Sequence, residues 1–137
     1  MRHPVHPVLV HFPVACWSLG SLFDIASIYF VDETARLATS LISIGLVLAV
    51  PAMIAGLLDL RNIKKDSPAQ DIVMTHISYV LVTWLLYAAA LYTRLQPIEN
   101  EYITIVLSSA GLVCLGVAGW YGGRLVYQYA VGVHLDE

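Results

Sequence analysis

Charged residues are scarce in this chain of 137 residues, of which only 12% are Asp, Glu, Lys or Arg. A soluble domain carries about 25% charged residues, so the chain has about half the charge that a water-facing surface uses. Hydrophobic residues make up 58% of the chain, and its mean hydropathy is +0.73. These figures exclude an ordinary soluble domain and predict one small membrane domain, residues 1–137.

Basic residues and cysteines are also few. The chain has 7 Lys and Arg against 10 Asp and Glu, a formal net charge of −3. Nucleic acid is therefore excluded as a partner, because phosphate binding requires a basic patch. The two cysteines, Cys16 and Cys114, lie in separate apolar runs without disulfide or metal-type spacing, and we interpret both as small buried residues.

Four apolar runs are long enough to cross a bilayer, which takes about 20 residues of helix. They cover residues 7–30, 37–58, 72–92 and 102–121. The segments between them are polar and charged, and two contain proline, so we expect loops there. The sequence thus predicts an all-α, four-helix transmembrane bundle in contact with the lipid bilayer.

An even number of crossings places both termini on one side of the membrane. Lys and Arg near the ends of membrane spans mark the cytoplasmic side. The terminal side carries Arg2, Arg61, Lys64, Lys65 and Arg124, and the other side carries Arg36 and Arg94. We therefore predict that both termini are cytoplasmic.

All five histidines fall on this terminal side. They are His3, His6, His11, His76 and His134. If Pro7 is the first helical residue, His11 and His76 lie at a similar depth in two different helices. A helical bundle can hold a metal ion or a haem between two such imidazoles.

Residues near this level are candidates to support a site, each with a structural alternative. Gly116 and Gly119 either let helices pack closely or leave room for a flat macrocycle. Arg124 either anchors its helix at the interface or binds an anionic group such as a haem propionate. Asp59 either hydrogen-bonds a histidine or only ends a span. Trp17, Tyr79 and Trp120 are the aromatic candidates to line the site.

The segment HPVHP around His6 predicts an extended or turn-like arm. The arm either folds back to add His6 as a ligand or remains a loose terminus. Asp24 lies about 20 Å from His11 along the helix and points about 140° away from it. We interpret Asp24 as a capped or paired carboxylate near the other side of the membrane. No repeat of about 20–50 residues is evident.

Three stretches of the chain resemble one bacterial membrane family, called domain of unknown function 2231. They are HPVHPVLVHFPV at the start, GLLDL at the end of the second span and GWYGGRLVYQYAVGV near the end. The resemblance covers nearly the whole chain and implies a bacterial inner-membrane protein. Its pattern marks His6, His11, Asp24, Asp59, His76, Gly123 and Val126. Ala130 stands where the pattern has glycine. Relatives joined to Rieske iron–sulfur domains imply a redox setting.

The leading functional hypothesis is a small b-type haem protein that transfers electrons to or from a Rieske-type or cytochrome partner. Its predicted cofactor-binding residues are His11, His76, Arg124, Gly119 and Gly116. The alternative is a protein that binds or transports copper or zinc. Its predicted metal ligands are His11, His76, His6 and Asp59. A cofactor-free accessory subunit and a homo-oligomer also remain open. Enzymatic activity is not predicted, because a nucleophile–base pair and a phosphate-binding loop are both lacking.

Overall fold

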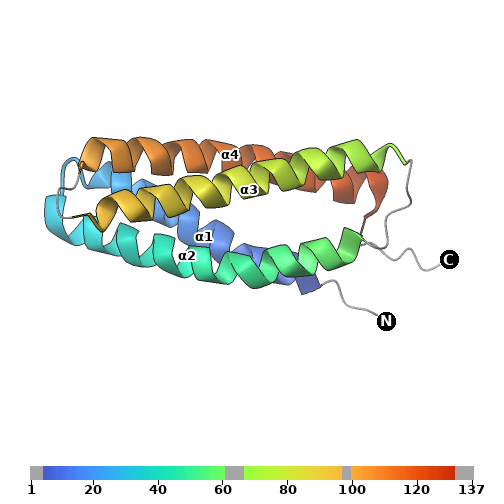
Figure 1. Ribbon diagram of the computed structural model, residues 1–137, viewed down its shortest axis with the longest axis horizontal. Coiled ribbons are helices and arrows are strands. Elements are labelled where there is room, and N and C mark those ends of the chain that lie inside the picture. The colour runs from blue at the N-terminus through green and yellow to red at the C-terminus, as the bar shows by residue number, and fades with distance from the viewer. Residues whose placement is uncertain (1–4, 61–66, 97–99, 132–137) are drawn as a thin grey trace.

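The computed structural model describes residues 5–60, 67–96 and 100–131, and these residues form four helices and no strand (Figure 1). The helices are α1 (Val5–Ala26), α2 (Val31–Asp59), α3 (Ala69–Arg94) and α4 (Glu101–Tyr129). Each is long and apolar enough to cross a membrane. The predicted all-α bundle of four spans is therefore confirmed.

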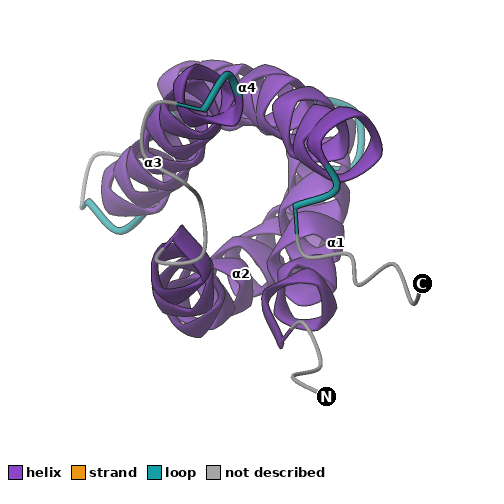
Figure 2. Cartoon of the chain, turned by 90° about the vertical axis from the view of Figure 1, so that its right-hand side faces the viewer, coloured by secondary structure: helices purple, strands orange, loops and turns teal. Residues whose placement is uncertain are grey.

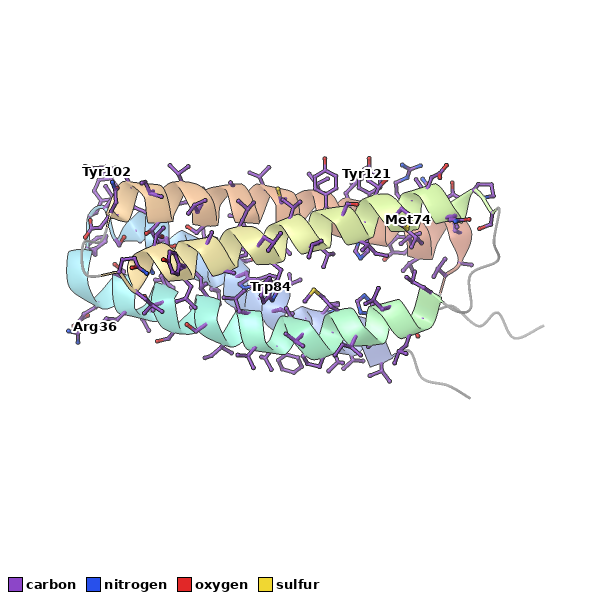
Figure 3. The ribbon with its side chains drawn as sticks, in the orientation of Figure 1. Arg36, Met74, Trp84, Tyr102 and Tyr121 are labelled. Atoms are coloured by element: carbon purple, nitrogen blue, oxygen red, sulfur yellow. The ribbon has the colours of Figure 1, made fainter. Side chains whose placement is uncertain are left out.

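The four helices form two hairpins arranged in a ring (Figure 2). Helix α1 packs along α2 and α3 packs along α4, whereas the hairpins touch each other less, through α1 with α4 and α2 with α3. At the second contact, Trp84 of α3 donates from Nε1 to the Leu46 carbonyl of α2 over 3.3 Å (Figure 3). The start of α1 and the end of α4 lie at the same end of the bundle (Figure 1).

The outer surface of the bundle is apolar and its interior is partly polar. Side chains such as Val8, Phe12, Val47 and Val113 are more than half exposed. The buried polar or charged side chains include Ser21, Asp24, Thr83, Thr104 and Ser108. A soluble protein shows the reverse arrangement, because water solvates polar side chains at the surface and apolar side chains are buried. The surface of this bundle instead matches the hydrocarbon of a bilayer.

An aromatic stack joins the two hairpins at the centre of the bundle. The rings of Trp17 and Tyr87 lie 4.9 Å apart between centroids, with 10° between their planes. The Tyr87 hydroxyl lies 2.8 Å from the Ser21 hydroxyl. Each ring packs on a glycine: a Cβ at Gly45 would lie 2.6 Å from the indole, and one at Gly111 would lie 3.0 Å from the phenol ring. The stack therefore depends on the absence of a side chain at both glycines.

The helix boundaries differ from the predicted spans at several ends. Helix α1 ends at Ala26, and the segment VDETAR (residues 31–36), predicted to be a loop, begins α2. Helix α4 continues to Tyr129, eight residues beyond the predicted end at residue 121. Hydropathy marks the part of a helix that lies in hydrocarbon, and these helices extend past it with polar or interfacial residues.

The start of α1 corrects the prediction of an extended arm, as far as residues 5–7 are concerned. The helix begins at Val5, so Pro7 lies in its first turn. The first four N–H groups of a helix have no partner within the helix, so a proline there removes no hydrogen bond. His6 is consequently a helical residue with a fixed direction.

Candidate functional site

His6 of α1 is held against α2 by one hydrogen bond and one close packing contact. Its Nδ1 lies 2.7 Å from the carbonyl oxygen of Ala52. Its ring covers Gly56, one turn further along α2, where an added Cβ would lie 3.0 Å from Cε1 and Nδ1. The small face of α2 thus lets the imidazole lie directly on the helix backbone.

His76 of α3 is held against α4 in the same way. Its Nδ1 lies 2.9 Å from the carbonyl oxygen of Ala118, and a Cβ at Gly122 would lie 3.2 Å from its Cε1. One histidine from each hairpin therefore lies at the end of the bundle where α1 begins, which we call the histidine end.

These hydrogen bonds fix the tautomer of both rings. A carbonyl oxygen only accepts, so Nδ1 carries the proton and donates it in His6 and in His76. In each neutral ring, Nε2 is then unprotonated and keeps its lone pair. No partner for Nε2 of either ring occurs within residues 5–60, 67–96 and 100–131. Metal-binding histidines show this arrangement, with the other ring nitrogen bonded to a backbone carbonyl.

Helix geometry explains why His6, rather than His11, reaches the interior. His6 and Asp24 are 18 residues apart, which is five full turns, so both point to the same face of α1. That face is buried at Pro13, Trp17 and Asp24. His11 lies five residues from His6, about 140° around the helix, and its side chain is exposed. The structure therefore directs His6, and not the predicted His11, to the buried face of α1.

The two predicted glycines lie on the outer surface of α4. Gly116 and Gly119 are exposed, and an added Cβ would meet no atom within 4 Å at either position. The buried positions of α4 include Gly111, Ala118 and Leu125. On α4, the glycine that packs on a histidine is Gly122, which the sequence analysis missed. Gly111, Ala118, Gly122 and Leu125 follow one another at spacings of seven, four and three residues, which places them on one face of a helix. This spacing could have identified Gly122 from the sequence.

The charged candidates do not meet the histidines in this structure. Asp59 is exposed at the end of α2. Arg124 donates from Nε to Gln128 of its own helix over 3.0 Å, and its guanidinium lies 5.9 Å from the centre of the Tyr121 ring. His3 and His134 fall outside the described residues.

The other predicted lining residues are divided between the interior and the surface. Trp17 is buried, and Tyr79 is half-buried in a stack on Tyr121, with ring centroids 6.1 Å apart. Trp120 is 72% exposed. Over the described ranges, no three His, Cys, Asp or Glu side chains come together as a metal site. The histidine end thus offers two imidazoles, rather than the four-residue metal site that was predicted.

Two buried polar atoms on the inner faces of α1 and α3 also bear on the site. The Nε1 of Trp17 and the Oγ1 of Thr83 have no hydrogen-bond partner within the part of the chain that the structure describes. Buried polar groups are nearly always paired, often with water or a ligand. The bundle interior is therefore compatible with a bound group that offers hydrogen-bond acceptors.

Comparison with known proteins identifies a family for this chain. No curated protein and no solved structure matches the chain. The model of one family, described as predicted membrane protein (DUF2231), matches residues 2–135. This range includes both histidines of the pair and all four helices. The chain therefore belongs to the DUF2231 family of predicted membrane proteins.

Proposed function

We propose that this chain is a small b-type haem protein of the bacterial inner membrane, in which His6 and His76 would hold the haem. One observation carries the proposal. Two imidazoles from different hairpins lie at the same end of the bundle, and each is oriented by a carbonyl so that Nε2 is free. When bound, the haem would supply one-electron oxidation and reduction of its iron, which suits electron transfer.

Residues around the pair have defined roles in this proposal. The carbonyls of Ala52 and Ala118 hold the ring orientations and raise the basicity of Nε2. Gly56 and Gly122 let the rings lie flat on α2 and α4. Arg124 follows Gly122 by two residues at the same end of the bundle, and among the described residues it is a cation that could pair with an anionic group such as a propionate. His11, Gly116 and Gly119 no longer take part.

The number of ligands favours haem over a bare metal ion. Zinc sites use three or four protein ligands, whereas no group of three such side chains occurs among the residues that the structure describes. A haem already supplies four equatorial nitrogens and requires only two axial ligands. Copper or zinc bound by the same pair is the alternative, and it predicts a stoichiometric metal without haem absorption. A Rieske-type or cytochrome protein remains the proposed redox partner.

An absorption spectrum of the purified chain tests the proposal. We expect protein produced with ample haem supply to show a Soret band and one haem per chain. His6→Ala and His76→Ala should each remove the band. His11→Ala is the matched control, because this exposed histidine lies on the same helix, and it should retain the band. A wild-type protein that folds without a Soret band would contradict the proposal, and bound copper or zinc would support the alternative.

A further inference from the structure

The two hairpins carry matching residues at fixed distances along the chain. In α1 and α3, matching residues are 70 positions apart. These pairs are His6 with His76, Trp17 with Tyr87, and Asp24 with Arg94. In α2 and α4, the distance is 66 positions. These pairs are Gly45 with Gly111, Ala52 with Ala118, and Gly56 with Gly122.

Matching residues also make matching contacts. In each hairpin the histidine bonds the alanine carbonyl and covers the glycine one turn later, with N···O distances of 2.7 Å and 2.9 Å. In each hairpin the central aromatic ring covers the second glycine. The same two contacts, eleven residues apart, thus occur twice in one chain. Chance placement of histidines would not reproduce both.

Burial follows the same correspondence. In α1 the buried positions include Pro13, Trp17 and Gly20, and their matches Thr83, Tyr87 and Ala90 are buried in α3. In α2 the buried positions include Ala38, Ile42, Gly45 and Ala52, and their matches Thr104, Ser108, Gly111 and Ala118 are buried in α4. At these seven pairs of positions, both hairpins present a buried residue to the interior, although most of the side chains differ.

The arrangement of the helices relates the two hairpins by an axis along the bundle. Helices α1 and α3 both begin at the histidine end, so the hairpins run in the same direction (Figure 1). The ring of helices in Figure 2 places them opposite each other. Where a residue touches its own match, the contact lies on a twofold axis. The Trp17–Tyr87 stack and the Asp24–Arg94 ion pair are two such contacts.

We propose that the chain consists of two equivalent halves related by a pseudo-twofold axis along the membrane normal, and that the group bound at His6 and His76 lies on this axis. This inference rests on the proposed function for the identity of that group. Each half contributes the same atom, Nε2, with the same carbonyl behind its ring. The ligand class is therefore a single metal centre that two equivalent imidazoles could bind, and haem iron belongs to this class.

The ion pair shows where the two halves must differ. A twofold axis brings identical residues together, and identical charged residues would repel each other. Neutral imidazoles can share one metal, so the histidines are the same in both halves. At the opposite end of the bundle, the matching positions carry Asp24 and Arg94, whose opposite charges attract. The ion pair therefore favours packing of the N-terminal half against the C-terminal half of the chain. Two copies of the same half would instead bring two identical charges together.

A charge exchange in the full chain tests the equivalence without reference to haem. Asp24→Arg and Arg94→Asp should each lower Tm and the yield of monodisperse protein. The double exchange should recover most of both, because the two positions match. Recovery will be incomplete, since Arg94 also bonds Thr39, whose match is Ile105. A double variant no better than either single variant would overturn the equivalence.

Methionine variants test the position of the bound group on the axis. His6→Met and His76→Met should give the same altered haem spectrum and the same rise in midpoint potential, since histidine–methionine ligation raises the potential. If either variant loses haem, His6→Gly and His76→Gly with added imidazole should recover the same fraction of haem.

The outcomes of these tests separate the two proposals. If the chain binds haem but the variants at His6 and His76 differ in spectrum, midpoint potential or haem recovery, the bound group does not lie on the pseudo-twofold axis. The proposed function would then still stand. A wild-type chain without haem would contradict the proposed function, and the charge exchange would still decide the equivalence of the halves.

Discussion

Asp24 of α1 and Arg94 of α3 form an ion pair in the bundle interior, with side chains 0% and 9% exposed. Arg94 also donates to the Ala35 carbonyl over 3.2 Å and to the Thr39 hydroxyl over 3.0 Å. One guanidinium therefore connects α1, α2 and α3 at the end opposite the histidines. The prediction that Asp24 is a paired carboxylate near that side is confirmed.

Replacing the arginine of this pair should destabilise the bundle strongly. Arg94→Met leaves the Asp24 carboxylate buried without its cation, and the loss of one partner of a buried pair costs about 3–5 kcal/mol. The double variant Asp24→Asn, Arg94→Met should cost less, because no charge stays buried. Unfolding in detergent micelles measures both values. Arg36→Met, at an exposed position of α2, is the control. Equal losses in the single and double variants would contradict this account.

The sequence predicts the number of helices because bilayer thickness sets the length of an apolar run. It predicts their inward faces less well, since lipid and helix neighbours both accept apolar side chains. The contrast that identifies the buried face of a soluble helix is therefore weak here. The few interior polar residues, such as Ser21, Asp24 and Thr83, carry the remaining signal. Aligning α1 on Asp24 would have selected His6 over His11.

The internal repeat escaped sequence analysis for a physical reason. Its period of 66–70 residues exceeds the range expected of repeat proteins, and few of the matched residues are identical. Matching positions conserve burial and contact rather than residue type: Trp17 matches Tyr87, and Asp24 matches Arg94. The identical pairs include the histidines, glycines and alanines of the candidate site, together with apolar pairs such as Val10 with Val80 and Leu46 with Leu112. The contacts in the structure are what make these matches visible.

Reporter fusions should find both ends of the chain in the cytoplasm. Of the basic residues assigned to the other side of the membrane, Arg94 is buried in the ion pair, which leaves Arg36 alone on that surface. The excess of Lys and Arg on the terminal side is thus larger than the sequence count indicated. A fluorescent protein fused after Glu137 should fluoresce, and alkaline phosphatase fused there should be inactive. Active phosphatase would reverse the orientation.

The end of α4 should be stabilised by a glycine at position 130. Ala130 has φ 50° and ψ 31°, a left-handed conformation in which its N–H bonds the Val126 carbonyl over 3.1 Å. A Cβ in this region costs about 1–2 kcal/mol, so Ala130→Gly should recover about 1 kcal/mol, less the entropy that glycine loses. Ala15→Gly, inside α1, should instead destabilise by about 1 kcal/mol. Thermal unfolding should show a higher Tm for Ala130→Gly and a lower Tm for Ala15→Gly. A lower Tm for both variants would contradict the assigned conformation of residue 130.

Alanine at the two glycines beneath the histidines should separate the candidate site from the rest of the bundle. In Gly56→Ala and Gly122→Ala, the new methyl group would lie 3.0 Å and 3.2 Å from an imidazole, which must move and strain its bond to the carbonyl. We expect each variant to lose about 1–2 kcal/mol of stability and part of its bound haem. Gly116→Ala and Gly119→Ala are matched controls on α4, with no atom within 4 Å of the new methyl group. These two variants should keep the haem, and their free energy of unfolding should rise by up to about 1 kcal/mol because alanine has a higher helix propensity than glycine. Equal haem occupancy in all four variants would show that the packing of the two rings does not control the site.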